Sequence, residues 1–377
     1  MRFYSSAYNM YRLTEEEINQ LEQQVSEGNP EACYKLGRYL YCVRPEPDSV
    51  NRACALFIQA NGEGVLDAKV ALHTCWKNGD FGMVNRTKAK QFLLDALEGG
   101  SEYAAKCQVL NILYGTAEQE ADPQKAINVL QSLIANSDNP YFYGLMGDAY
   151  EELGDHKEAA LWYDKAWDNG VTDVAFLRAI AHAGGFDEEN YINDYDTYLD
   201  YLEEGMEAED GWAIYLYFLN IYMNKLSEIE EGDKEEIERC KKSLLSGLEF
   251  AASRGCGEAA VSLGDIYRNG DYHFEQDNNE AFSWYAKGAI LQSKSGYENM
   301  YEMIAAGEID YSQDFMDECA VCGTRLGSEF LMRKVVEGYK SGRLTHIAAE
   351  IEQYYLPEIE AEDEELPDDD GRYDAYA

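Results

Sequence analysis

Basic residues, proline and histidine are scarce in this sequence: its 377 residues include 31 Lys and Arg, 7 Pro and 5 His, against 72 Asp and Glu. The net charge of −41 repels phosphate backbones and anionic lipid head groups, which argues against binding to nucleic acid or to a membrane surface. No segment approaches the roughly 18 consecutive apolar residues of a membrane span, and the N-terminal residues lack the apolar run of a signal peptide. We therefore expect a cytoplasmic protein whose partner is another protein, and a basic partner would suit this charge.

The negative charge is not confined to one segment. The last 21 residues, 357–377, contain ten acidic residues and one Arg, and they have too few aliphatic residues to pack. This composition predicts a disordered acidic tail. Without the tail the chain still carries 62 acidic and 30 basic residues. The charge of the folded body therefore serves either solubility or the attraction of a basic ligand.

Motifs that carry chemistry are missing. The chain has no phosphate-binding glycine loop, no nucleophile elbow and no helical His pair with a Glu between. Among its nine Cys the one constellation is Cys319-Ala-Val-Cys322, which supplies at most half of a zinc site and lies in a helical pattern rather than at a strand-helix junction. We predict no enzyme activity, no cofactor and no metal site, with Cys319 and Cys322 as the remaining metal candidates.

A repeated helical pattern is the main positive signal. Four stretches, which begin near residues 31, 67, 141 and 258, share one order of residue types. Small residues come first and are followed by a bulky residue, which in most stretches precedes a Gly. An aromatic residue or Leu comes three positions later. The recurring Gly residues are Gly37, Gly147 and Gly264. Because a Gly inside a helix costs about 1 kcal/mol relative to Ala, its recurrence predicts that a neighbouring helix packs closely at that position.

A second helical stretch follows each of these. Its marker is an Ala with bulky residues three and four positions later, which gives one apolar helical face. The marker residues are Ala53, Ala89, Ala126, Ala159 and Ala281. Asp or Asn upstream and Gly downstream are suited to cap the helix ends. The paired pattern recurs at spacings of 33 to 46 residues, which predicts an all-α fold, an α/α superhelical solenoid of about 8 helix-turn-helix units.

Four regions are predicted along the chain. They are an N-terminal capping helix within 1–29, the repeat array 30–327, C-terminal capping helices 328–356 and the acidic tail 357–377. Thr14 and Glu17 fit a capping box that opens the first helix. The longest spacing contains a charged insertion, 226–240, which is expected to lengthen one loop and one helix. The least regular units are 171–209 and 295–327.

Residues 141–170 carry the fullest form of the pattern. The matching positions are Gly147, Tyr150, Ala159, Trp162, Tyr163, Lys165, Ala166 and Gly170. This combination resembles the Sel-one-like subfamily of tetratricopeptide-like repeats, and the resemblance covers about residues 30–327. It implies an α/α superhelix whose first helices line a concave face, with adaptor or scaffold roles and no intrinsic catalysis.

The concave face is where a partner is expected to bind. Residues two before, two after and five after the Leu of the Leu-Gly pair leave the core face by helical periodicity. The predicted partner-binding residues are Tyr34, Arg38, Tyr41, Lys77, Asn111, Tyr114, Asp148, Glu151, Tyr215, Tyr222, Asp265 and Arg268. Tyr is suited to interfaces, although packing between repeats is the competing interpretation for each Tyr.

Two functions fit these features. The first is a non-catalytic adaptor whose concave groove binds a peptide or protein partner. The alternative is a charge-driven inhibitor of a basic protein, of the immunity type or a mimic of nucleic acid. A charge-driven complex weakens steeply with salt, whereas a complex held in the groove does not.

Overall fold

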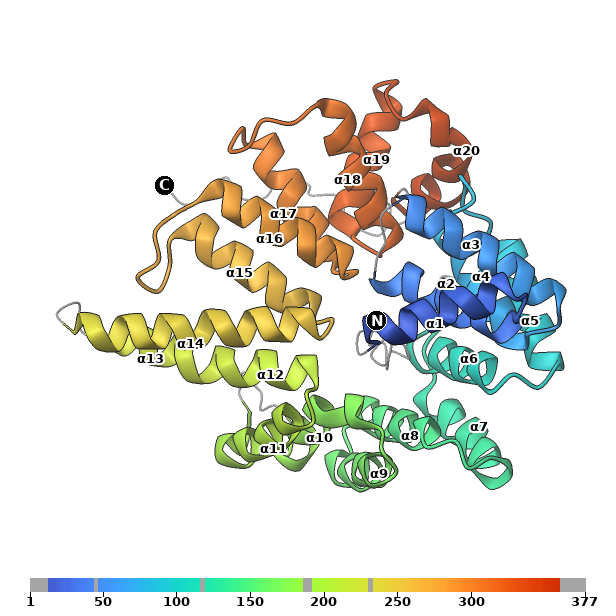
Figure 1. Ribbon diagram of the computed structural model, residues 1–377, viewed down its shortest axis with the longest axis horizontal. Helices are drawn as coiled ribbons and strands as arrows, with labels where there is room; N and C mark the ends of the chain where they lie inside the picture. The colour runs from blue at the N-terminus through green and yellow to red at the C-terminus, as the bar shows by residue number, and fades with distance from the viewer. Residues whose placement is uncertain (1–12, 44–46, 116–118, 186–191, 230–232, 360–377) are drawn as a thin grey trace, which may run out of the picture.

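The computed structural model describes residues 13–43, 47–115, 119–185, 192–229 and 233–359. Within these ranges the chain has no β-strand and consists of paired helices that follow one another in a curved array (Figure 1). The predicted all-α solenoid is therefore confirmed. None of the described helices is both long and apolar enough to cross a membrane. The predicted tail lies outside the described residues from position 360 onward.

Eight helix pairs make up the described part of the array. The first helices are α2 Pro30–Val43, α4 Leu66–Asn78, α6 Glu102–Tyr114, α8 Tyr141–Glu152, α10 Ala175–His182, α12 Gly211–Phe218, α15 Gly257–Asn269 and α17 Lys294–Ala305. The second helices are α3 Pro47–Gly62, α5 Arg86–Glu98, α7 Pro123–Asn136, α9 His156–Asp168, α11 Tyr195–Glu207, α14 Lys234–Ser253, α16 Asn278–Ile290 and α18 Gln313–Arg325.

Further elements precede, interrupt and follow the pairs. They are α1 Glu15–Ser26, η2 Thr172–Val174, the π-helical turn η3 Leu219–Met223, α13 Asn224–Glu228, α19 Glu329–Lys340, η4 Thr345–Ile347, α20 Ala348–Glu350 and the π-helical turn η5 Ile351–Tyr355. Thr14 and Glu17 form a capping box at the start of α1. The charged insertion contributes to α13 and to α14, which has 20 residues.

Side-chain caps explain where most second helices begin. An Asn or Asp precedes each of six second helices and accepts a hydrogen bond from a backbone N–H in the first turn. These residues are Asn85, Asp122, Asp155, Asp194, Asp233 and Asp277. Each cap satisfies an N–H that has no partner inside the helix.

The recurring Gly residues hold the two helices of a unit close together. A Cβ added at Gly147 would lie 2.4 Å from Cε1 of Tyr163, and one at Gly264 would lie 2.5 Å from the ring of Tyr285. Both rings belong to the second helix of the same unit. Only a residue without a side chain leaves room for them, so the predicted close approach of a neighbouring helix is confirmed.

The array curves until its two ends meet. The elements after the eighth pair, α19 to η5, lie beside α3 and α4 in Figure 1. The backbone N–H of Val84 donates to Glu350 Oε2 at 3.4 Å, and that of Arg86 donates to the Tyr354 hydroxyl at 3.3 Å. We call this junction the seam.

The packed chain reaches past the predicted start of the tail. Residues 356–359 are helical, and Ile359 is buried in one apolar cluster with Ile351 and Tyr355. Residues 357–359, which were predicted to belong to the tail, are therefore helical, and Ile359 is packed. Burial of the Ile359 side chain explains why the helix continues through Pro357.

Candidate functional site

The first helices line the inner face of the curve. First helices of successive units pack on one another, as α2 does on α4, α4 on α6, α6 on α8 and α15 on α17. On the inner side of a curved array, elements approach their counterparts in the next unit most closely. Second helices such as α5, α7 and α9 accordingly lie toward the outside (Figure 1).

Basic and tyrosine side chains gather on the inner face of the first four units. The group, called the inner strip below, consists of Tyr34, Arg38, Lys77, Tyr103, Lys106 and Tyr141. The guanidinium of Arg38 lies 5.8 Å from the ring centroid of Tyr34 and 5.4 Å from that of Tyr103, two units further along. The amino group of Lys106 lies 4.6 Å from the ring centroid of Tyr141. Ring faces attract cations at these distances.

Burial changes the protonation of the inner strip. It lowers the pKa of Lys106 to about 8, and partial desolvation by the surrounding protein atoms lowers the pKa of Lys77, whose side chain still reaches solvent. Burial raises the pKa of Asp173, on η2, to about 6, and the charge of Lys106 offsets part of this rise. Lys106 is therefore mostly protonated at neutral pH and loses its charge as the pH rises through about 8. The strip thus brings three basic side chains to the inner face, with the carboxylates of Asp173 and Asp148 close to Lys106.

Two predicted partner-binding residues are hydrogen-bonded by a tyrosine from the second helix of their own unit. Asp148 is only 1% exposed and accepts a hydrogen bond of 2.8 Å from the Tyr163 hydroxyl. Asp265 accepts one of 2.7 Å from Tyr285 in the same way. The predicted orientation is therefore wrong for Asp148. Helical periodicity correctly places Asp148 away from the apolar face of α8. However, Tyr163 of α9 packs over Asp148 and buries it.

Other predicted residues bridge helices in the first half of the array. The Tyr41 hydroxyl donates to Asp80 Oδ2 at 2.7 Å and accepts from Asn78 at 2.9 Å. Glu151 pairs with His156 at 2.9 Å, between the two helices of one unit. Asn111 and Tyr114 are half-buried on α6, and Lys77 is exposed on α4. Lys77 thus remains the most accessible basic residue of the inner strip.

Predicted residues in the second half also make intramolecular contacts. Tyr215 lies 3.1 Å from the Ser262 hydroxyl, and the ring of Tyr222 stacks on Phe218. Arg268 forms two hydrogen bonds of 3.0 Å to the carboxylate of Glu308. These contacts join neighbouring helices, so the structure does not bring the twelve predicted residues into one continuous surface.

The Tyr163 hydroxyl stabilises its unit, and its removal is measurable. Tyr163→Phe is expected to lower the free energy of unfolding by about 1–3 kcal/mol, because the buried carboxylate of Asp148 loses the hydrogen bond from this hydroxyl. Urea denaturation followed by circular dichroism measures the change. Tyr143→Phe, whose hydroxyl makes no hydrogen bond to the described residues, is the matched control and should stay within about 0.5 kcal/mol. Equal losses in both variants would contradict this role.

The seam contains a buried ion pair that the sequence did not indicate. The Glu350 side chain is 1% exposed, and Arg325 from α18 donates to it at 2.8 and 3.1 Å. The hydroxyl of Tyr355 and the N–H of Val84 also donate to Glu350. Burial raises the pKa of Glu350, but the hydrogen bonds from Arg325 and Tyr355 outweigh it, so the pKa lies below its ordinary value.

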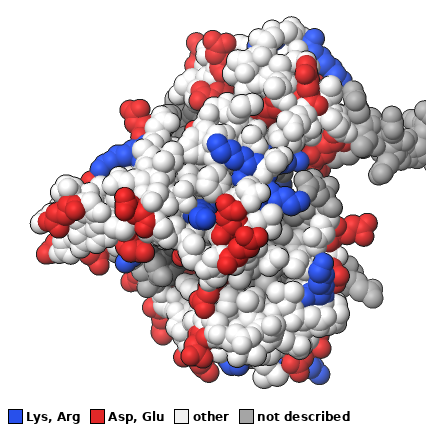
Figure 2. All heavy atoms as spheres, turned by 90° about the vertical axis from the view of Figure 1, so that its right-hand side faces the viewer, with Lys and Arg blue, Asp and Glu red and all other residues white. Residues whose placement is uncertain are grey.

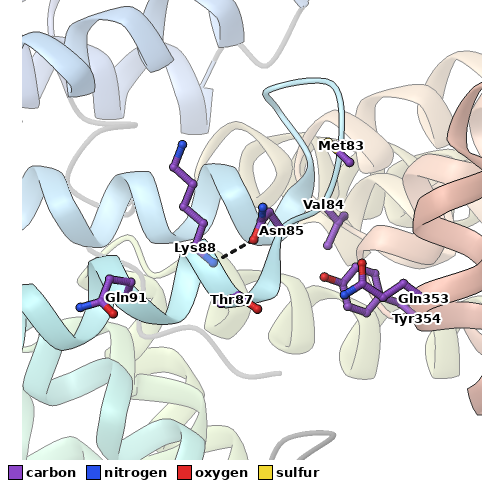
Figure 3. Close-up of a pocket in the computed structure, with 8 residues that line it drawn as sticks. All are labelled: Met83, Val84, Asn85, Thr87, Lys88, Gln91, Gln353 and Tyr354. Carbon is purple, nitrogen blue, oxygen red and sulfur yellow. Dashed lines mark hydrogen bonds between the residues drawn. The ribbon is translucent and has the colours of Figure 1, made fainter.

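A hollow of about 490 Å³ opens beside the seam (Figure 3). Its walls come from the turn before α5, from α5 itself and from η5; the lining residues are Met83, Val84, Asn85, Thr87, Lys88, Gln91, Gln353 and Tyr354. The Arg86 guanidinium lies 4.4 Å from the ring centroid of Tyr354. Basic side chains gather near the middle of this side of the molecule, with acidic side chains around them (Figure 2).

The thiols of Cys319 and Cys322 both lie on α18. Burial raises the pKa of Cys319 to about 12 and also raises that of Cys322. Neither belongs to a group of three possible metal ligands among the described residues. The sequence pair therefore has the surroundings of packed cysteines.

The paired helices and the inner face define the class of this protein as a helical-repeat solenoid. No protein-family model matches the sequence. The chain is similar to "Protein sel-1 homolog 2" from mouse (Mus musculus), with 23% identity over 260 residues that cover 68% of this chain and 32% of that protein. The predicted resemblance to Sel-one-like repeat proteins is confirmed, and the chain spans about a third of the length of this curated relative.

The chain also has weak similarity to solved structures. One is a Sel1 repeat protein from Oxalobacter formigenes, with a TM-score of 0.40 and 18% identity over 89% of this chain and 94% of that chain. Another is c5321, a protective antigen of uropathogenic Escherichia coli strains with an SLR fold, with a TM-score of 0.39 and 16% identity over 90% of this chain and 71% of that chain.

Proposed function

We propose that this chain is a non-catalytic scaffold that binds a peptide or protein segment along its inner face. The observation that carries the proposal is the inner strip, where Arg38 and Lys106 lie against tyrosine rings. Arg38 is half-buried, and a cation held by ring faces keeps a defined direction for pairing with a carboxylate of a bound segment, while the buried Lys106 adds positive charge behind it. The tyrosines add apolar contact area at little cost in side-chain entropy.

The segment that suits this face carries acidic side chains beside apolar ones. The long-range field of the chain is negative and slows the approach of such a segment, so recognition depends on short-range contacts with the strip. Because Lys106 loses its charge as the pH rises through about 8, binding is expected to weaken over the same range.

Charge reversal at Lys77 tests the proposal. Lys77 is exposed on α4, so Lys77→Glu should leave the unfolding free energy within about 0.5 kcal/mol. The intact chain and the variant are used for affinity capture from lysate of the source organism, and the affinity of each captured protein is then measured. We expect Lys77→Glu to weaken binding at least about tenfold, since an attraction becomes a repulsion at the interface.

The matched control is Lys157→Glu, an identical change at an exposed position on the outer helix α9. The proposal requires that this variant binds as the intact chain does. If the overall negative charge attracts a basic protein instead, both variants bind more tightly and by similar factors, and the complex dissociates at high salt. Equal affinity of all three proteins would place the binding surface away from the inner face.

A further inference from the structure

The pairing of α3 with α4 brings two thiols and a carboxylate together. Cys54 Sγ and Cys75 Sγ lie 3.5 Å apart. One oxygen of Asp80 joins them in a group whose ligand atoms all lie within 4.8 Å of one another. Cys54 and Cys75 are 4% and 0% exposed, and Asp80 is half-buried. We propose that Cys54, Cys75 and Asp80 bind one zinc ion, with a water molecule as the fourth ligand.

The chain turns sharply to place the carboxylate over the thiols. Gly79 ends α4 with a φ of 79°, a left-handed conformation that favours glycine. The N–H groups of Gly79 and Asp80 both donate to the carbonyl of Cys75. The carboxylate therefore folds back toward the Cys75 side chain, although Asp80 comes five positions later in the sequence.

The spacing of the sulfurs matches tetrahedral zinc. Two Zn–S bonds of about 2.3 Å at the tetrahedral angle put the sulfurs about 3.8 Å apart, and 3.5 Å is observed. Thiolate sulfur is a soft ligand that binds zinc in preference to magnesium or calcium. A carboxylate is a further ligand in many zinc sites. The three ligands converge from two adjacent helices, so a single ion can reach all of them.

Surrounding groups orient and balance the ligands. The Tyr41 hydroxyl donates to Asp80, and Asn78 donates to Tyr41, which together fix the direction of the carboxylate. Two thiolates and one carboxylate exceed the charge of Zn²⁺ by one unit. The Arg325 guanidinium, which is ion-paired with Glu350, also packs against Gly79 beside Asp80. It therefore reduces the negative potential that Glu350 and the three ligands create together.

Metal content and cobalt spectroscopy test the site on the full chain. The protein is expressed with zinc and purified under reducing conditions. Inductively coupled plasma mass spectrometry is expected to find one zinc per chain. Replacement of zinc by Co²⁺ should give a thiolate-to-cobalt charge-transfer band and the intense visible bands of tetrahedral cobalt. Cys75→Ser should remove the charge-transfer band or reduce it to half, and Asp80→Asn should weaken zinc affinity at least about tenfold.

Cys240→Ser is the control, because Cys240 is a buried thiol on α14 outside the proposed site. It should retain both the zinc and the cobalt bands. Circular dichroism checks that each variant is folded, and Asp80→Asn keeps the test decisive if Cys75→Ser does not fold. A metal-free wild-type chain that shows no charge-transfer band with Co²⁺ would overturn the proposal, as would full bands in Cys75→Ser. Partner binding does not enter this test, so its outcome is independent of the proposed scaffold function.

Discussion

Glu350→Gln is expected to destabilise the chain by about 3 kcal/mol and to open the seam. The substitution keeps the shape of the side chain but removes the ion-pair partner of the partly buried Arg325, and breaking a buried ion pair on one side costs about 3–5 kcal/mol. The lower end of this range applies because the Arg325 side chain is 20% exposed. Urea denaturation measures the loss, and small-angle X-ray scattering measures the expected increase in the radius of gyration.

The control for this prediction is Glu358→Gln, an exposed acidic residue in the last described helix. It removes the same charge and should leave both measurements unchanged within error. Hydrogen exchange at the amide of Val84 adds a local readout, because this N–H donates to Glu350. A seam that closes through apolar packing alone would leave the exchange rate and the radius of Glu350→Gln at their wild-type values.

The seam should also respond to pH with a defined sign. The pKa of Glu350 is lowered in the folded chain, so the charged form is preferred in the folded state. A carboxyl group whose pKa is lower in the folded chain stabilises the fold at any pH above the pKa of the unfolded chain. This stabilisation is lost as the pH falls through the pKa of the folded chain. We expect acid to loosen the seam of the wild-type chain, and Glu350→Gln to lack this part of the pH dependence.

Gly147→Ala is expected to lower the free energy of unfolding by about 2–3 kcal/mol. The new Cβ would lie 2.4 Å from the ring of Tyr163, and overpacking of this kind costs about 1–3 kcal/mol. The ring is fully buried and its hydroxyl is bonded to Asp148, so it has no room to move aside. Thermal and urea denaturation of the purified variant measure the effect.

Gly62→Ala provides the comparison for Gly147→Ala. Gly62 is the last residue of α3, and a Cβ there would meet nothing within 4 Å. Ala favours the helix and reduces the freedom of the unfolded chain, so this substitution should be neutral or stabilising by up to about 1 kcal/mol. If both variants lost the same stability, helix propensity and not close packing would explain the recurring glycines.

The regular part of the fold was predictable because each helix pair repeats the same local sequence pattern. Gly37, Gly147 and Gly264 indicated the close approach of a second helix, and the upstream Asp and Asn residues indicated where second helices begin. Helical periodicity also placed the first helices, but it describes one helix at a time. It did not reveal that Tyr163 reaches over Asp148, because that contact depends on how two helices pair.

Contacts between distant units left no trace in the sequence pattern. Glu350 appears as one more acidic residue in a chain with 72 of them, and its burial follows only from the summed rotation of eight successive pairs. Cys54 and Cys75 likewise lie 21 positions apart in the sequence, and no motif links them. Conversely, Cys319 and Cys322 drew attention by their spacing, although their spacing along one helix says nothing about further ligands.

The seam makes the number of repeats a constraint on this protein. Open solenoids contact only nearest neighbours, so they lengthen or shorten by whole repeats and can fray from either end. Here a hydrogen bond spans 266 residues of sequence, and it forms only if eight pairs complete the turn. Gain or loss of one repeat would separate its two ends by the width of a helix pair. Linear arrays can evolve by duplication of a repeat. In this protein such a duplication would break the seam, unless the contacts of the seam changed at the same time.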